Sequence, residues 1–286
     1  MSLAPSARGS EGRVRTARLA LHVRRAGRGP ALLFLGGSNT DMRLRCPVMA
    51  SGLPDAFDVI AYEPRGLARS DAPPGDWTMR DYAEDAVSLL DALGIDRALV
   101  LGESFGGMTA LHLAALHPDR VSGLAVMAAT AGGRLGASYP VEGWLPLPPD
   151  QAARAALRVQ DLRFAACEAT DPPAAAARHA QRTAFERAFR ACPANAAGYP
   201  RLLQARAGHD AVDLLDRIAC PAIVMAGQDD GQAPLAAVTR LAEALPRARL
   251  WTFPGGHGFG FATPEPVRRL IAAWADPHTA QEAPHD

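Results

Sequence analysis

Short apolar runs alternate with helix-like stretches along most of the chain. The runs that predict buried strands lie at residues 31–35, 57–62, 98–101 and 121–127, and a weaker alternation at 16–24 predicts a half-exposed strand. One of the helical stretches between them begins at a capping box, Thr78 to Asp81, and stops at Gly94. Apolar strands that alternate with amphipathic helices indicate an α/β fold, with a mostly parallel open sheet and helices on both faces.

This alternation is interrupted once, by a segment rich in Ala, Arg and Pro. The segment has helical patches at 151–159 and 174–190 and no strand-like run. The alternation then returns, with strands expected at 222–226 and 249–253 and helices at 235–245 and 264–274. We therefore expect one α/β core, residues 1–133 and 211–286, with a helical lid, residues 134–210, inserted after the sixth strand. Residues 276–286 are expected to form a frayed tail.

Composition narrows the classes of partner. The formal net charge of the 286 residues is +0, which does not favour binding to nucleic acid or to anionic lipid. All 30 Lys and Arg residues are arginine, so a lysine Schiff base or lysine general base is excluded. The four cysteines lie far apart without C-x-x-C spacing, and we expect neither a metal site nor a disulfide framework.

With no signal-peptide pattern and no long apolar span, we expect a cytoplasmic protein whose partner is a small molecule, without a membrane contact.

The stretch LVLGESFGG, residues 99–107, places a serine between two glycines where a strand is expected to pass into a helix. Ser104 is the only serine in the chain with glycine at both −2 and +2. In this context G-x-S-x-G is the nucleophile elbow, a turn so tight that the serine backbone is strained and its hydroxyl is lifted above the sheet edge. Taken alone, the motif also fits a glycine-rich turn that binds phosphate or binds nothing.

Two later loops distinguish between these alternatives. Asp230 follows the expected strand at 222–226, and His257 follows the expected strand at 249–253. The carboxyl ends of parallel strands share one edge of the sheet, where open α/β sheets have their sites. Serine, acid and histidine in this chain order are the elements of a nucleophile, an orienting carboxylate and a general base. We therefore predict that Ser104, Asp230 and His257 are catalytic.

With these residues in place, the sequence resembles the α/β-hydrolase fold superfamily over nearly its whole length outside the insertion and the tail. The similar segments are EPRGLARSDAP (63–73), GESFG (102–106), GQDDGQAP (227–234) and PGGHGF (254–259). Within the superfamily, the chain looks most like serine hydrolases of the enol-lactonase and small-ester hydrolase branch. The resemblance implies that Asp230, rather than Asp229, is the triad acid. It also implies an oxyanion hole made by the backbone N–H groups of Gly37 and Phe105, and no metal or organic cofactor.

The chain departs from the family pattern at three positions. Leu35 stands where the family usually has the histidine of a His-Gly pair, so the conformation of the oxyanion loop needs its own test. Glu63 replaces the usual aspartate of D-x-R-G, and Ala68 replaces the second glycine that follows it. We interpret these two as variation in packing.

The resemblance implies that Ser104 carries an acyl group during hydrolysis of an ester or lactone. Carbon–carbon bond hydrolysis of a vinylogous diketone and cofactor-free perhydrolysis use the same triad and stay open, as does a non-enzymatic small-molecule receptor. In the lid, Trp144, Tyr139 and Phe164 are the predicted substrate-binding aromatics. Glu103 is either solvated or ion-paired, or it alters the electrostatics of the histidine.

Overall fold

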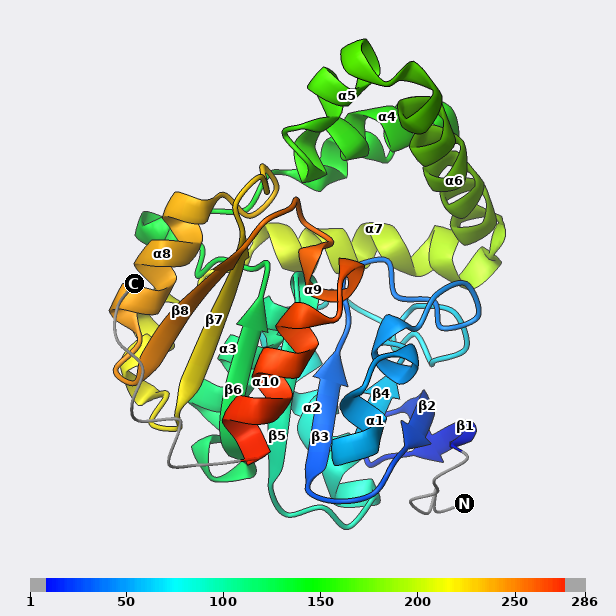
Figure 1. Cartoon of the computed structure of the whole chain (residues 1–286). Helices are drawn as coiled ribbons and strands as arrows, with labels where there is room; N and C mark the ends of the chain where they lie inside the picture. The colour runs from blue at the N-terminus through cyan, green and yellow to red at the C-terminus, as the bar shows by residue number, and fades with distance from the viewer. Residues whose placement is uncertain (1–8, 276–286) are drawn as a thin grey trace.

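The computed structural model describes residues 9–275, and these form an eight-stranded sheet between two layers of helices (Figure 1). The strands are β1 (Ser10–Arg15), β2 (Ala20–Ala26), β3 (Ala31–Leu35), β4 (Asp58–Tyr62), β5 (Ala98–Glu103), β6 (Val121–Met127), β7 (Ala222–Gly227) and β8 (Ala248–Phe253). Their order in the sheet is β1-β2-β4-β3-β5-β6-β7-β8. The predicted tail at 276–286 lies outside the described residues.

The sheet is parallel from β4 to β8, and only the pairings of β2 with β1 and with β4 are antiparallel. This confirms the predicted fold class. Strand β1 was not predicted, because its sequence SEGRVR has a single buried residue, Val14, and therefore no clear apolar alternation. An edge strand needs little apolar surface because only one of its neighbours is a strand.

The helices are α1 (Leu53–Ala56), α2 (Met79–Ala92), α3 (Phe105–Leu116), α4 (Pro149–Gln160), α5 (Phe164–Thr170), α6 (Pro172–Ala191), α7 (Pro193–Ala207), α8 (Leu235–Ala244), α9 (Phe259–Ala262) and α10 (Glu265–Ala275). Five 3₁₀ turns accompany them at Pro47–Ala50, Pro118–Arg120, Gly133–Leu135, Val141–Trp144 and Val212–Arg217. The predicted capping box is present: Thr78 and Asp81 each accept from the other's backbone N–H at the start of α2. No helix within residues 9–275 is both long enough and apolar enough to cross a membrane.

Two apolar layers hold the helices against the sheet. Residues of α2, α3 and α8 share one buried cluster with one face of the strands, and residues of α1, α9 and α10 share the other cluster with the opposite face. Helix α3 follows the serine corner directly and is buried along nearly its whole length. The serine corner therefore stands on a rigid strand and a rigid helix.

Helices α4 to α7 lie between β6 and β7 in the chain and above the carboxyl edge of the sheet (Figure 1). The two ends of the segment meet, since Gly132 pairs with Asp210 and the Ala211 N–H donates to the Ala131 carbonyl. The segment between them therefore leaves the core and returns to it at one place. Helix α7 was not predicted, because Gly198 and Pro200 are poor helix formers. Gly198 is needed there: a Cβ would lie 1.8 Å from the Gly66 carbonyl oxygen.

A buried histidine pair joins α3 to the segment after α7. His112 Nε2 lies 3.3 Å from His209 Nδ1, and His209 Nε2 lies 2.9 Å from the Thr130 carbonyl oxygen. The carbonyl only accepts, so His209 Nε2 carries a hydrogen; in the neutral ring its Nδ1 then accepts from His112 Nε2. Burial lowers the pKa of His112 and of His209 from 6.5 to about 4, and the neighbouring His209 contributes to the shift at His112.

This pair predicts a loss of stability in mild acid. The unfolded chain takes up protons at both histidines below their ordinary value of 6.5, whereas the folded chain does so only near 4. The free energy of unfolding should therefore fall as pH drops from 7 towards 5, by up to about 1.4 kcal/mol per pH unit for each histidine. Urea unfolding at several pH values measures this slope. The double variant His112→Asn/His209→Gln should flatten it, whereas His117→Gln, outside the buried pair, should leave it steep.

Candidate active site

Ser104 occupies the sharp corner between β5 and α3. Its φ of 54° and ψ of −116° place a non-glycine residue in a strained region of backbone space. Close packing explains the two glycines of the motif. A Cβ on Gly106 would lie 1.9 Å from the Leu35 carbonyl oxygen, and one on Gly102 would lie 2.3 Å from the Gly106 carbonyl oxygen. The corner therefore has the geometry that the sequence predicted.

Ser104, His257 and Asp230 form one hydrogen-bonded chain. Ser104 Oγ lies 2.9 Å from His257 Nε2, and His257 Nδ1 lies 2.8 Å from Asp230 Oδ2. The other carboxylate oxygen of Asp230 accepts from two backbone N–H groups, at 2.8 and 2.9 Å. Asp230 is thereby fixed with its second carboxylate oxygen towards Nδ1, which leaves the lone pair of Nε2 facing the serine. The alternative acid, Asp229, faces away and pairs with Arg163.

The loop after β3 lies against the serine. A Cβ on Gly37 would be 3.8 Å from Ser104 Cβ, so the two backbones are neighbours. Thr40 holds this turn by donating its N–H and its hydroxyl to the Gly37 carbonyl, at 3.1 and 2.7 Å. Phe105 is the first residue of α3, where backbone N–H groups have no helical partner. The two predicted oxyanion donors are thus at the site, although Leu35 replaces the usual histidine.

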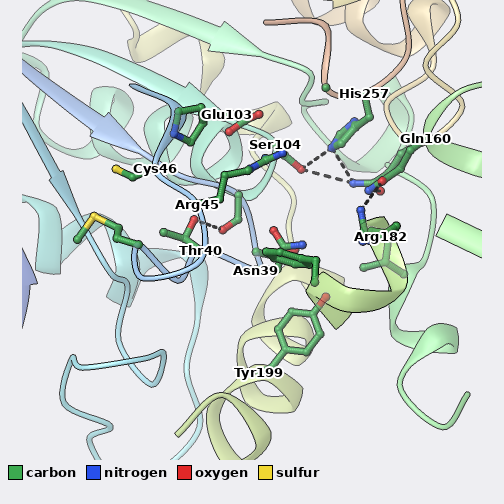
Figure 2. Close-up of a pocket in the computed structure, with 18 of the residues that line it drawn as sticks. Asn39, Thr40, Arg45, Cys46, Glu103, Ser104, Gln160, Arg182, Tyr199 and His257 are labelled. Carbon is green, nitrogen blue, oxygen red and sulfur yellow. Dashed lines mark hydrogen bonds between the residues drawn. The ribbon is translucent and has the colours of Figure 1, made fainter. Parts of the chain in front are cut away.

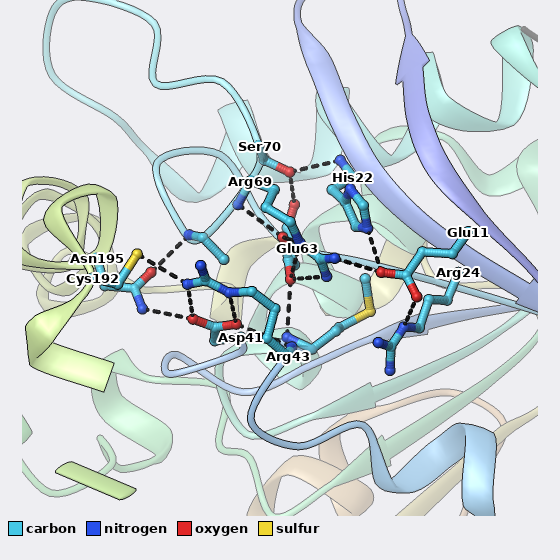
Figure 3. A network of polar contacts seen from close by, with 12 residues as sticks. Glu11, His22, Arg24, Asp41, Arg43, Glu63, Arg69, Ser70, Cys192 and Asn195 are labelled. Carbon is cyan, nitrogen blue, oxygen red and sulfur yellow. Dashed lines mark hydrogen bonds and ion pairs between the residues drawn. The ribbon is translucent and has the colours of Figure 1, made fainter. Parts of the chain in front are cut away.

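A buried polar network supports this loop from behind (Figure 3). Glu63 is fully buried and accepts from the backbone N–H of Met42 at 3.0 Å and of Arg69 at 2.9 Å. Asn195 of α7 donates to Asp41 at 3.0 Å and accepts from the Ala68 N–H at 2.7 Å. Glu63 therefore binds two loops together, which is more than variation in packing.

A second hydrogen-bonded chain enters the site from the lid. Arg182 Nη1 donates to Gln160 Oε1 at 2.8 Å, and Gln160 Nε2 donates to Gln232 Oε1 at 2.9 Å. Gln232 Nε2 then lies 2.8 Å from His257 Nε2 and 3.5 Å from Ser104 Oγ (Figure 2). A guanidinium only donates, so Arg182 determines which way round both amides sit. An N–H group is consequently aimed at the catalytic pair.

The backbone of the lid reinforces this connection. The Gln160 carbonyl accepts from the His257 N–H at 2.6 Å, and the Val159 carbonyl accepts from the Gly231 N–H at 3.0 Å. Neither Gln160 nor Gln232 was predicted from the sequence. The position of Gln232, two residues after the predicted acid, was the only signal available for them.

A cavity of about 310 Å³ opens on Ser104 and His257. Trp144 lines it, together with Leu157, Phe185 and Tyr199 of the lid. The other two predicted aromatics, Tyr139 and Phe164, do not line this cavity. Tyr139 is 39% exposed and stacks on the outer side of the site against Trp144, with ring centroids 5.6 Å apart. Phe164 is only 1% exposed and packs inside the lid beneath Arg178.

Some of the charged side chains that line the cavity have an ion-pair partner, and others have none among residues 9–275. Arg178 pairs with Asp161 at 2.8 Å, and Arg182 pairs with Glu186 at 2.9 Å. The guanidinium of Arg45 and the carboxylate of Glu103 line the same cavity, and neither has a hydrogen bond or ion pair from its side chain within residues 9–275. Glu103 is 9% exposed. Of the interpretations that the sequence left open, an ion pair of Glu103 finds no partner among residues 9–275.

The fold and this strained serine corner are those of an α/β hydrolase. Residues 30–263 match the family model described as alpha/beta hydrolase fold. The chain belongs to that family, as its motifs predicted, and is an enzyme of the hydrolase class.

Individual relatives agree with this assignment. A protein of Caulobacter sp. (strain K31) named "Putative carbamate hydrolase RutD" is 35% identical over 255 residues, which cover 83% of this chain and 86% of the relative. The crystal structure of the enol-lactonase from Burkholderia xenovorans LB400 has 26% identity and a TM-score of 0.72, covering 94% of this chain and 100% of that chain. Est816, described as an N-acyl homoserine lactone degrading enzyme, has 25% identity and a TM-score of 0.71, with 92% and 100% covered. The chain thus lies near the lactonase and esterase branch.

Proposed function

We propose that the protein is a serine hydrolase that cleaves a small carboxylic ester or lactone through an acyl-enzyme on Ser104. The observation that carries this proposal is the unbroken chain from Ser104 through His257 to Asp230, with contacts of 2.9 and 2.8 Å. The relatives described above are named for carbamate, enol-lactone and homoserine lactone chemistry, which supports an acyl carbon bonded to oxygen or nitrogen as the point of attack.

The reaction proceeds in two transfers. Ser104 Oγ attacks the acyl carbon while its proton passes to His257 Nε2, and the oxyanion is held by the N–H groups of Gly37 and Phe105. The imidazolium then gives that proton to the leaving oxygen, which leaves an ester on Ser104. Water attacks this ester, His257 takes a proton from the water and returns it to Ser104, and the acid departs. Asp230 stabilises the imidazolium in both halves.

A turnover panel tests the proposal. Wild-type protein should hydrolyse p-nitrophenyl acetate and at least one class among short esters and lactones, and a small fluorophosphonate should label Ser104. Turnover of vinylogous diketones alone would indicate carbon–carbon hydrolysis instead. Negligible turnover throughout, with ligand binding retained, would indicate a receptor. Incorporation of ¹⁸O from labelled water into the acid product verifies that water is the final acceptor.

The amide of Gln232 should influence the rate of this reaction. Its N–H faces His257 Nε2 and competes with the Ser104 hydroxyl for the lone pair of that nitrogen. In Gln232→Leu this competition is removed, so kcat/KM should rise about fivefold, the equivalent of a hydrogen bond worth roughly 1 kcal/mol. Gln232→Glu, whose carboxylate cannot donate, should change kcat/KM in the same direction.

Arg182→Leu provides the sharper comparison. It leaves Gln232 intact but frees both amides to turn, so kcat/KM should change in the same direction by a smaller amount. Arg187→Leu removes an exposed cation from the same helix without touching the chain of amides and serves as the control. A value of kcat/KM that is identical in all four variants and in the wild type would show that the amide does not act on the histidine.

A further inference from the structure

The buried carboxylate of Glu103 is exceptional among the buried acids. The others within residues 9–275 each accept from an arginine, a histidine or backbone N–H groups; these are Asp41, Asp58, Glu63, Asp85, Asp161, Glu186 and Asp230. Glu103, at 9% exposure, has no such donor among the described residues. Its carboxylate is not sealed from the cavity that it lines, so a donor from outside this chain can reach it there.

The residues around Glu103 indicate that this partner would bind in the cavity that opens on Ser104 and His257. Glu103 is the last residue of β5, on the same side of the sheet as Leu101, and the cavity wall on this side includes the apolar Phe34, Met42 and Ala61. An apolar wall offers no hydrogen bond to a carboxylate, so the only open direction is the cavity. A ligand in the cavity is therefore the group that can reach Glu103.

The position of Glu103 relative to Ser104 indicates which half of a substrate would contact its carboxylate. In Figure 2, Glu103 lies on one side of Ser104, with Arg45 and Cys46, whereas His257, Gln160 and Arg182 lie on the other. In the proposed reaction His257 protonates the leaving group, which must therefore lie on the histidine side. The acyl group then extends to the side of Glu103.

We propose that Glu103 binds the acyl half of the substrate by accepting a hydrogen bond from an N–H or O–H group on the carbon α or β to the acyl carbon. This inference rests on the proposed function. The substrate class it defines is hydroxy-, amino- or acylamino-substituted esters and lactones. Glu103 is a specificity-determining residue in this account, since Asp230 already serves His257 and Glu103 has no hydrogen bond to the imidazole.

Matched substrates test the proposal. The p-nitrophenyl esters of 3-hydroxypropanoate and 3-methoxypropanoate both carry oxygen at the same carbon, but only the hydroxyl donates. Wild-type kcat/KM should favour the hydroxyl ester by roughly tenfold to a hundredfold, as expected for a hydrogen bond to a charged acceptor. In Glu103→Leu the ratio should fall to about that of the two esters' intrinsic reactivities, and in Glu103→Gln, which still accepts weakly, to an intermediate value. Labelling of Ser104 by fluorophosphonate reports that each variant keeps a folded elbow.

Arg45→Gln is the control for charge. It removes the unpaired cation from the same side of the cavity and should leave the hydroxyl-to-methoxy ratio unchanged. The 3-amino and 3-acetamido esters identify the donor: faster turnover of the 3-amino ester, increased further in Arg45→Gln, indicates an ammonium, and preference for the hydroxyl or acetamido ester indicates a neutral donor. Loss of the ratio in Arg45→Gln would show that Glu103 is not the acceptor.

Failure of the inference is separable from failure of the proposed function. Calorimetry measures how tightly wild type and Glu103→Leu bind the unreactive N-methyl amides of 3-hydroxypropanoic and 3-methoxypropanoic acid. The preference for the hydroxyl group is thus measured even if no ester turns over. Tighter binding of the hydroxyl amide by wild type alone supports the inference. Equal affinities and equal ester ratios in both proteins would overturn it, while turnover and labelling at Ser104 would still stand for the proposed function.

Discussion

Ser104→Ala, His257→Ala and Asp230→Asn are each expected to remove nearly all hydrolysis. The three residues act as one unit, so kcat should fall by roughly 10⁴- to 10⁶-fold in each case, with the smallest loss at Asp230. The double variant Ser104→Ala/His257→Ala should be no worse than either single variant, because the histidine has no role once its nucleophile is gone. Initial rates on the best ester of the panel measure these losses, and circular dichroism verifies that each variant is folded.

The neighbouring aspartate provides the matched control for the acid. Asp229 lies next to Asp230 in the same loop, but its carboxylate pairs with Arg163 and accepts from the Gly255 N–H instead of the imidazole. Asp229→Asn should therefore keep most of the wild-type activity. An inactive Asp229→Asn beside an active Asp230→Asn would reverse the assignment of the acid, and full activity in Ser104→Ala would refute the acyl-enzyme.

The second large effect is expected at Asn195, on stability. Asn195 is fully buried, and its side chain joins α7 to the loop at Asp41, to the Ala68 N–H and to the Phe189 carbonyl. Asn195→Leu preserves the volume but leaves these buried groups short of a partner. The free energy of unfolding should fall by about 2 to 4 kcal/mol, measured by urea denaturation at pH 7.

Asp41 links this loss of stability to the site. Burial disfavours its charge, but hydrogen bonds from Arg43 and Asn195 overcome this and hold the pKa of Asp41 below its ordinary value. Asp41 follows Thr40, which holds the Gly37 turn, so Asn195→Leu should also lower kcat on the remaining folded protein. Arg187→Leu, at an exposed position of α6, should change neither quantity. Unaltered stability in Asn195→Leu would show that water replaces the lost hydrogen bonds.

The sequence by itself determined the alternation of strands and helices, the nucleophile elbow, and the order of serine, acid and histidine along the chain. These features report local constraints: apolar runs mark buried strands, and the glycines at 102 and 106 mark places where a Cβ cannot fit. Strand β1 and helix α7 escaped prediction because tertiary contacts outweigh their local signals. β1 needs little apolar surface at the edge of the sheet, and α7 tolerates Gly198 because of its packing against Gly66.

Only the tertiary structure decided what surrounds the serine. Trp144 and Tyr139 lie close together in the sequence and stack on each other, yet only Trp144 lines the cavity. The chain from Arg182 through Gln160 to Gln232 joins three residues from two lid helices and the acid loop, a proximity that no spacing along the chain encodes. That the carboxylate of Glu103 has no donor among residues 9–275 is likewise visible only once every neighbour is placed. Whether a buried polar group has a partner depends on how distant segments pack, and a linear pattern carries no record of that packing.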